Sequence, residues 1–400
     1  MPGPAGRSDR LSRRRWIGCL LGLAVTILVF SPFRVQADTF TVTRTDDPVP
    51  DGCRTNDCSL REAVIAANAS PGSTIVLQAL TYNLSRIGAG EDLGWQGDLD
   101  VLQDLTISGS YATINANGVD RVFHVLNDAY LTLIGVTMTG GSAAGANGGG
   151  IYVENGWANL TECTLANNTA ASGGGLNNKG RITLSGCTLY SNHATLGGGI
   201  YNQGPRADLT NCTISSNTAS NLGGGLYNFG AAAYLDFTTI ALNSALTGGG
   251  IYIYSGAVEV WHTLIAGNIG SSPDCAGGLV SAGYNLIGNS NGAGFGFLAS
   301  DILDPPYSSN HIVGPLAGYG GPTLTHALVE GSPAIDAGDP YFAGPPYYDQ
   351  RGWGYSRILG WAVDIGAYEY DPGEDGGEGG IISLGGAAAR GGCGVSTSSK

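Results

Sequence analysis

The chain has little positive charge, no helical repeat and, after residue 37, no long apolar segment. It contains 18 Lys and Arg against 32 Asp and Glu, and its formal net charge is −14. A body this acidic argues against nucleic acid and anionic membranes as binding partners. No segment after residue 37 has the roughly 18 consecutive apolar residues that a transmembrane helix needs. Glycine is frequent, with 67 residues, but it follows no Gly-X-Y period, which excludes collagen.

The dominant feature is a block of about 25 residues that occurs five times between Gly148 and Asn268. Each copy opens with a glycine triplet, continues with an apolar residue and closes on an asparagine. Successive triplets start 25, 24, 26 and 25 residues apart. A fixed period of this size indicates a solenoid, in which each unit is stable because it stacks on its neighbours. The triplets occupy residues 148–150, 173–175, 197–199, 223–225 and 248–250, and the apolar residues that follow them are Ile151, Leu176, Ile200, Leu226 and Ile251.

The segments inside each copy are short and rich in β-branched and aromatic residues, which excludes helical repeats. Two or three short strands per copy, separated by turns with Gly and Asn, predict one coil of a right-handed parallel β-helix. Residues 73–300 therefore predict an all-β solenoid of about nine coils spaced about 4.8 Å apart. We expect a short capping helix at its N-terminal end and an irregular cap at its C-terminal end.

In-register stacking predicts columns of like residues, and the repeats contain such columns. Three of them are apolar or small, and we expect them to fill the interior. A fourth column consists of asparagines where the chain must turn, and we interpret it as a structural ladder. The interior columns are Leu160, Leu184, Leu209, Leu235 and Val260; Cys163, Cys187, Cys212, Thr238 and Thr263; and Leu165, Leu189, Ile214, Ile240 and Ile265, and the asparagines are Asn168, Asn192, Asn217, Asn243 and Asn268.

The ends of a β-helix expose strand edges, which need covers. Residues 59–68 predict a short helix across the first coil, because Ser59 and Glu62 form a capping box before an apolar stripe. That stripe contains Leu60, Ala63, Val64 and Ala67. Residues 301–370, where the repeat stops, are predicted to cover the other end.

Residues 1–37 are predicted to be a signal peptide, with three arginines before an apolar stretch and a small-x-small cleavage site at 35–37. An uncleaved signal anchor is the alternative. Removal of this segment leaves 12 basic and 31 acidic residues, a net charge of −19. Cys53 and Cys58 are predicted to form a disulfide in an oxidising compartment. The stacked cysteines are expected to be free thiols, although neighbours could pair, and Cys275 and Cys393 have no evident partner.

Two end motifs carry a resemblance to known families. The N-terminal one, Cys58-Ser59-Leu60-Arg61-Glu62-Ala63, is the motif after which the CSLREA domain is named, and residues 38–72 resemble that domain. Residues 301–370 resemble the choice-of-anchor Q domain through the stretches 331–338, 349–352 and 364–369. The resemblance implies an exported bacterial β-helix of the surface-protein type, without an established activity. Residues 371–400 depart from the pattern, because this acidic, Gly-rich tail has neither an apolar span nor a basic cluster; we interpret it as a disordered linker.

Catalytic candidates are few. A glycoside hydrolase needs two carboxylates at one groove, and Asp98 with Asp100, Asp46 with Asp47, and Asp336 with Asp349 and Asp364 are the available groups. A lyase needs a base and calcium, and the cations of the central coils are Lys179, Arg181 and Arg206. No acidic cluster accompanies these cations in the repeat. The histidines His124, His193 and His262 are interpreted as surface or hydrogen-bonded structural residues.

Two further groups of residues are candidate sites. Tyr152, Tyr201, Tyr227 and Tyr252 recur one position after the first apolar residue of their copies, so alternation predicts an outward tyrosine strip. Such a strip could bind sugar rings or a protein, or it could be a ladder that stiffens the sheet. In the C-terminal segment we expect Arg351 to lie between two aspartates and to fix irregular loops. These aspartates are drawn from Asp336, Asp349 and Asp364.

The function expected from the sequence is that of a secreted or surface-displayed bacterial protein with a structural, adhesive or interaction role and no catalysis. The alternatives are a polysaccharide lyase or glycoside hydrolase on a β-helix scaffold, and carbohydrate binding along the tyrosine strip. The expected partner is an extracellular glycan or protein, and the expected state is a monomer. No cofactor and no metal are expected, with calcium as the one open alternative.

Overall fold

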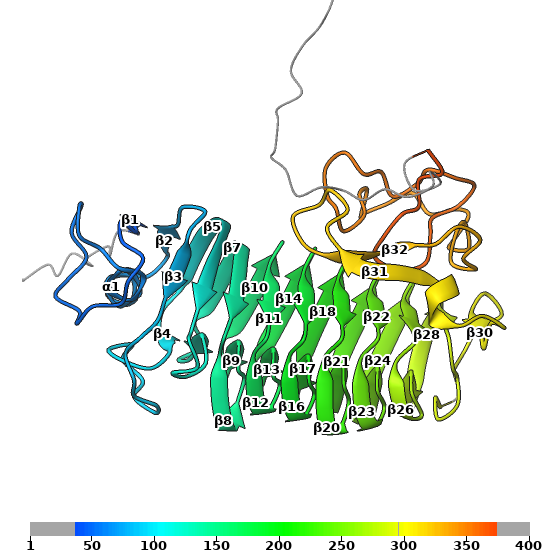
Figure 1. The fold of residues 1–400 in the computed structure, drawn as a ribbon, viewed down its shortest axis with the longest axis horizontal. Helices are drawn as coiled ribbons and strands as arrows, with labels where there is room; N and C mark the ends of the chain where they lie inside the picture. Colours follow the sequence, from blue (N-terminus) through cyan, green and yellow to red (C-terminus); the bar gives the residue numbers. More distant parts are fainter. Residues whose placement is uncertain (1–36, 295, 374–400) are drawn as a thin grey trace, which may run out of the picture. The chain divides into compact units, whose positions relative to one another are not determined.

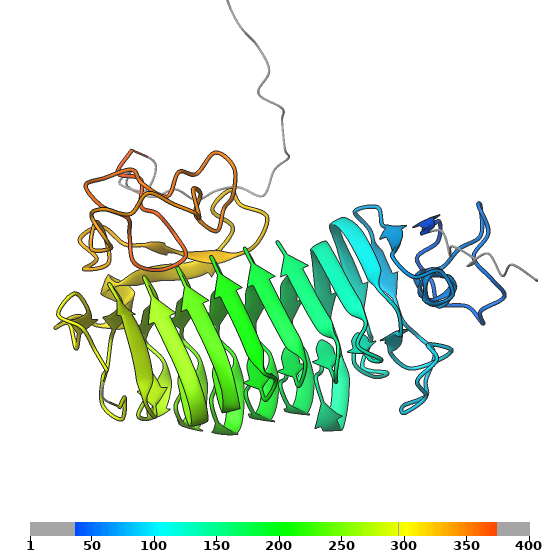
Figure 2. The same cartoon turned by 180° about the vertical axis from the view of Figure 1, so that it is seen from behind.

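The computed structural model describes residues 37–294 and 296–373. The predicted signal peptide, all but its last residue, and most of the predicted tail lie outside these ranges. Within them the chain is a parallel β-solenoid of about eight turns, so the predicted fold class is confirmed (Figures 1 and 2). Residues 84–98, within the predicted span, form a loop without strands. None of the described helices is long and apolar enough to cross a membrane.

Four ladders of parallel strands run along the solenoid. The first contains β1 (Thr39–Thr41), β2 (Ser73–Val76), β5 (Leu105–Asn115), β7 (Tyr130–Thr139), β10 (Trp157–Thr161), β14 (Arg181–Ser185), β18 (Arg206–Thr210), β21 (Leu226–Asp236), β24 (Ile251–Trp261) and β28 (Leu279–Gly283). The second contains β3 (Thr81–Asn83), the ends of β5 and β7, β11 (Thr164–Ala166), β15 (Thr188–Tyr190), β19 (Thr213–Ser215), β22 (Thr239–Ala241), β25 (Leu264–Ala266), β29 (Leu286–Ile287) and β30 (Ile302–Leu303).

The third ladder contains β4 (Leu99–Val101), β6 (Phe123–Val125), β9 (Ile151–Val153), β13 (Leu176–Asn178), β17 (Ile200–Asn202), the starts of β21 and β24, and β27 (Cys275–Ala276). The fourth is a separate sheet of six strands, β8 (Ser142–Asn147), β12 (Thr169–Ser172), β16 (His193–Leu196), β20 (Thr218–Leu222), β23 (Ser244–Thr247) and β26 (Ile269–Ser271). Outside the solenoid lie the helix α1 (Leu60–Asn68), the short helix η1 (Ser309–His311) and an antiparallel pair, β31 (Val313–Ala317) and β32 (Thr325–Leu328).

The interior columns have the predicted register and are buried. Leu160 pairs with Leu184 and Leu184 with Leu209, and all three side chains are at most 1% exposed. Cys163, Cys187 and Cys212 are free thiols in the same interior. Burial raises the pKa of the Cys163 and Cys187 thiols well above the usual value, so these cysteines act as small apolar side chains.

The asparagine column forms the predicted ladder. Asn192 donates from its backbone N and from Nδ2 to Oδ1 of Asn217, over 3.0 and 2.9 Å. Asn217 donates in the same way to Asn243. The chain of donors ends on Asp274, whose Oδ1 accepts from Asn268 Nδ2 over 2.8 Å. A carboxylate suits this last position, because the final member has only to accept.

The glycine triplets make the tight corners between the fourth and third ladders. Gly173 has a φ of +69°, where a side chain is strained. At Gly174 a Cβ atom would lie 2.6 Å from the carbonyl oxygen of Gly198 on the next coil. Each triplet therefore lets neighbouring coils approach at the corner, which explains its recurrence.

The N-terminal cover has the predicted form. α1 begins at a capping box of Ser59 and Glu62 and packs against β1, β2 and β4. Its apolar stripe is buried as expected. Arg61 on the same helix is also buried: it pairs with Asp47 over 2.7 Å and donates to backbone carbonyls of the 84–98 loop. This buried role of Arg61 was not predicted from the sequence.

The C-terminal segment, residues 305–373, lies along the side of the solenoid and not over its end. Figures 1 and 2 show it against the second ladder, over the later coils. The outward Thr and Ser residues of β15, β19 and β22 explain this placement, because they offer hydroxyl groups to the segment. Gln350 accepts from Thr213 over 2.6 Å and donates to Thr188 over 2.9 Å. The prediction that the C-terminal segment covers the end of the solenoid is therefore wrong for residues 305–370, whereas β30 does pair with β29 as the last rung of the second ladder.

Candidate functional site

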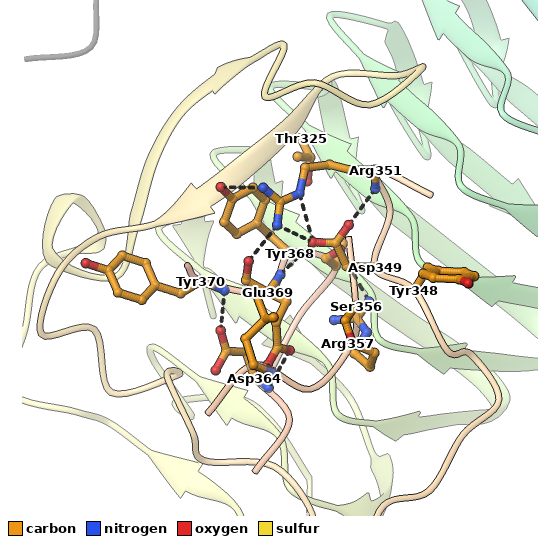
Figure 3. Close-up of polar contacts among 12 residues, drawn as sticks. Thr325, Tyr348, Asp349, Arg351, Ser356, Arg357, Asp364, Tyr368, Glu369 and Tyr370 are labelled. Carbon is orange, nitrogen blue, oxygen red and sulfur yellow. Dashed lines mark hydrogen bonds and ion pairs between the residues drawn. The ribbon is translucent and has the colours of Figure 1, made fainter. Parts of the chain in front are cut away.

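The C-terminal segment contains a buried network of charged residues. Arg351 donates to Oδ2 of Asp349 from Nε over 2.9 Å and from Nη2 over 2.7 Å (Figure 3). Its Nη1 donates to the Tyr368 hydroxyl, and its guanidinium lies 3.8 Å from the centre of the Tyr368 ring. Asp349 is therefore a carboxylate partner of Arg351, and the Tyr368 ring covers one face of its guanidinium.

The other two predicted aspartates bind backbone amides. Asp364 accepts from the backbone N of Asp336 and of Tyr370, each over 2.6 Å. Asp336 accepts from the backbone N of Trp361 over 2.7 Å. These contacts fix loops that have no ladder partners, which is a structural role. Glu369 takes part as well and was missed: its Oε2 accepts from the backbone N of Asp364 over 3.0 Å.

A second arginine joins the network to the solenoid. Arg357 is 1% exposed and lies 4.3 Å from the centre of the Phe237 ring. It donates to Oδ1 of Asn211 and to the Gly366 carbonyl. Sequence reasoning missed it, because Asn211 is 146 residues away and neither residue has a distinctive motif.

The buried carboxyl groups make the free energy of unfolding increase as the pH falls. Burial raises the pKa of Asp236 and Asp364 to about 7 and that of Glu369 to about 9. Such a carboxyl binds its proton in the folded state first, so the fold gains stability as the pH drops toward the ordinary value of about 4. His262 and His326 oppose this trend, because burial lowers the pKa of His262 to about 3 and lowers that of His326 below its usual value. The acids outnumber these two histidines, so we expect a higher unfolding temperature at about pH 5.5 than at about pH 8.

Calorimetry across this pH range is the measurement. Asp236→Asn, which mimics the protonated acid, is expected to raise the unfolding temperature at about pH 8 and to reduce its pH dependence. An unfolding temperature that falls between about pH 8 and about pH 5.5 would contradict the argument.

The tyrosine column differs from the predicted strip. Tyr152 and Tyr227 are only 7% and 4% exposed, and Asn177 on β13 separates Tyr152 from Tyr201. Tyr201, Tyr227 and Tyr252 stack with ring centres 5.0 and 5.4 Å apart and nearly parallel planes. Their facing ring surfaces therefore contact one another, so a sugar ring cannot stack between them. The expectation that all four are exposed is wrong. Alternation along a strand decides which way a side chain points, but neighbouring residues decide whether solvent reaches it.

An aromatic–arginine face lies instead on the outer side of the first ladder. We define it by Tyr130, Trp157, Arg181 and Arg206, which pair in this order on β7, β10, β14 and β18, and by Tyr234 on β21. Trp157 is 44% exposed, and the Arg181 guanidinium lies 4.9 Å from the centre of its ring. The face borders a depression of about 150 Å³.

The charges on this face stand out in an acidic chain. Arg206 lies 4.4 Å from the centre of the Tyr234 ring and pairs with Asp208 over 2.7 Å. Arg181 forms no ion pair with any described residue, and neither does Lys179, whose Nζ lies 5.2 Å from the Tyr152 ring centre. Two exposed cations therefore remain available to an anionic ligand.

The predicted acid pairs are mostly buried. Asp98 is 1% exposed, accepts from Arg121 over 2.7 Å, and has a pKa that burial raises to about 7. Asp100 is also buried. Asp46 is exposed but pairs with Arg44 over 2.7 Å, and the neighbouring Asp47 is bound by Arg61. These partners hold the carboxylates in structural contacts.

Comparisons with known proteins agree on the fold alone. No protein-family model matches the chain, and no curated protein matches it. Among solved structures, the crystal structure of pectate lyase Pel9A is similar, with a TM-score of 0.53 and 16% sequence identity. The match covers 84% of this chain and 97% of that one. The two chains therefore share a β-helix.

Proposed function

We propose that this chain is an exported bacterial protein, secreted or displayed at the cell surface, that binds a ligand and does not catalyse a reaction. Its resemblance to CSLREA and choice-of-anchor Q proteins and its signal-like first 37 residues support export. The disulfide between Cys53 and Cys58 also supports it, because structural disulfides persist in oxidising compartments. The chain acts as a monomer.

The aromatic–arginine face is the binding surface in this proposal, and its ligand is an extended anionic glycan. The observation that carries the proposal is the exposed Trp157 ring beside Arg181, whose guanidinium has no carboxylate partner among the residues that the structure describes. An exposed indole offers apolar area to a sugar ring, and a guanidinium binds a carboxylate or sulfate with two parallel hydrogen bonds. The face crosses successive coils, so it suits a ligand that runs along the solenoid.

The alternative is a polysaccharide lyase, favoured by the structural similarity to a pectate lyase. Arg181 or Lys179 would be the base in that case. The non-catalytic role is preferred here, because Asp208, the carboxylate beside Arg206 on this face, is already paired with that arginine.

Trp157→Ala and Arg181→Gln test the binding surface. With polygalacturonate as the probe, each variant is expected to weaken binding at least about tenfold, which corresponds to about 1.4 kcal/mol. Calorimetric titration of the full chain measures this, with neutral dextran as the comparison glycan. Trp361→Ala is the matched control, because Trp361 is 93% exposed and belongs to the C-terminal segment.

The same samples distinguish the alternatives. Unsaturated sugar products from polygalacturonate would replace the proposed role with the lyase. Weaker binding by Tyr201→Ala, with Trp157→Ala unchanged, would place the ligand on the tyrosine column. Equal affinity in all four variants would rule out both surfaces.

A further inference from the structure

Three acids surround His124 near the start of the third ladder. Asp100 on β4 pairs in register with His124 on β6, and His124 pairs with Tyr152 on β9. Asp92 comes from the 84–98 loop, and Glu154 directly follows β9. The His124 ring stacks on Tyr152 with ring centres 4.8 Å apart, which fixes the plane of the imidazole.

The buried atoms of this cluster lack hydrogen bonds. His124 is 6% exposed, and neither of its ring nitrogens has a hydrogen-bond partner among the described residues. Asp100 is fully buried; its Oδ2 accepts from the backbone N of Gly94 over 2.7 Å, but its Oδ1 has no partner. Buried polar atoms are nearly always satisfied, so these three atoms call for a ligand. His124 is therefore not a surface histidine, and its ring nitrogens contact three carboxylates at distances too long for hydrogen bonds.

The spacing of the polar atoms fits a metal ion better than it fits hydrogen bonds. His124 Nδ1 lies 3.5 Å from Asp100 Oδ1 and 3.7 Å from Asp92 Oδ1, and all three ligand atoms lie within 4.8 Å of one another. Hydrogen bonds between such groups are about 2.7–3.2 Å long. Ligand atoms about 2.0–2.1 Å from a tetrahedral ion are separated by roughly 3.3–3.5 Å.

We propose that Asp92, Asp100 and His124 bind one divalent transition-metal ion, with Zn²⁺ as the best fit. The ligand atoms are Asp92 Oδ1, Asp100 Oδ1 and His124 Nδ1. An imidazole nitrogen selects for Zn²⁺ and similar ions over Ca²⁺ and Mg²⁺, which take oxygen ligands. Asp92 has a side chain that is 63% exposed, so the fourth position opens to solvent.

Glu154 completes the site as an orienting group. Its Oε2 lies 3.4 Å from His124 Nε2, on the far side of the ring from the ion. A negative charge on that side favours the tautomer with its proton on Nε2, which keeps Nδ1 free for the metal. The ion also ties the 84–98 loop to the first coils. Because Arg61 of α1 donates to Gly94 and Gly97 in that loop, metal binding stabilises the N-terminal cover.

The experiment uses the full chain after treatment with a chelator. Titration with ZnCl₂ is expected to show one ion bound per chain and a raised unfolding temperature, whereas CaCl₂ and MgCl₂ bind much more weakly. Asp92→Asn and His124→Gln are each expected to weaken Zn²⁺ binding at least tenfold. Asp92 is exposed, so its variant tests the site even where a change at buried His124 disturbs folding. His311→Gln is the matched control, because His311 is exposed in η1.

The competing explanation is an ion pair between protonated His124 and the acids. It predicts no Zn²⁺ uptake, and that result would overturn the proposal. Uptake that is unchanged in Asp92→Asn and His124→Gln would also overturn it. With Co²⁺ as the probe, an absorption spectrum typical of nitrogen and oxygen ligands would support the site. Thiolate charge-transfer bands would assign the metal to cysteines and contradict it.

Discussion

Asn217→Ala is expected to lower the free energy of unfolding by about 3–6 kcal/mol, the largest single effect in the solenoid. The Asn217 amide accepts from the backbone N and from Nδ2 of Asn192, and it donates to the Leu189 carbonyl and to Oδ1 of Asn243. All of these groups are buried inside the coils, where no water replaces the lost partner. Each unsatisfied group costs about 1–3 kcal/mol, and the costs within one ladder are not fully additive.

Chemical denaturation and hydrogen exchange measure this effect. Loss of exchange protection is expected to centre on residues 189–217 and to spread along the ladder, because neighbouring coils stabilise one another. Asn221→Ala is the matched control, since Asn221 is exposed on β20 and the change there is expected to cost less than about 0.5 kcal/mol. Similar losses in the two variants would show that the ladder contributes nothing beyond its surroundings.

Arg351→Met is expected to cost about 3–5 kcal/mol and to release the C-terminal segment from the side of the solenoid. The change leaves Asp349 buried without its guanidinium partner, and it removes the contacts with the Tyr368 hydroxyl and with the Glu369 carbonyl. Methionine keeps the volume but supplies no charge. The coils themselves keep their own ladders, so we expect the loss of structure to stay within the segment.

Limited proteolysis of the segment, combined with calorimetry, measures this release. Arg351→Lys is expected to recover part of the stability, because lysine keeps the charge but loses the paired donors and the stacking on Tyr368. Arg54→Met is the control for an exposed ion pair: Arg54 and Asp51 are more than half exposed, and their pair contributes less than about 1 kcal/mol. If Arg351→Met resists the protease as well as Arg54→Met does, then Arg351 does not hold the C-terminal segment on the solenoid.

The solenoid could be predicted because its contacts repeat. Leu184 touches the leucines one coil away, and those neighbours occupy the same position in the next copy of the repeat. A contact partner is therefore visible in the sequence as a like residue about 25 positions away. The Asn192–Asn217 ladder follows the same rule. Tyr201, Tyr227 and Tyr252 also pair in register as the repeat predicts. Their burial was not predictable, because it depends on neighbouring residues that differ from one copy of the repeat to the next.

The contacts outside the repeat were not predictable in this way. Gln350 reaches Thr188 and Thr213, and Arg357 reaches Asn211, across more than 130 residues of sequence without any shared motif. The aromatic–arginine face combines five coils, and the position that the first four share carries tyrosine, tryptophan and two arginines. Asp92 joins His124 only because the 84–98 loop turns back toward the third ladder.

By itself, the sequence determined the coil, its interior columns, its asparagine ladder and its capping helix, because parallel in-register stacking places equivalent positions of successive repeats in contact. The tertiary structure alone decided where the C-terminal segment docks, which aromatic side chains remain exposed, and which acids gather around His124. These depend on how irregular segments fold against the regular coils, and irregular segments leave no period in the sequence.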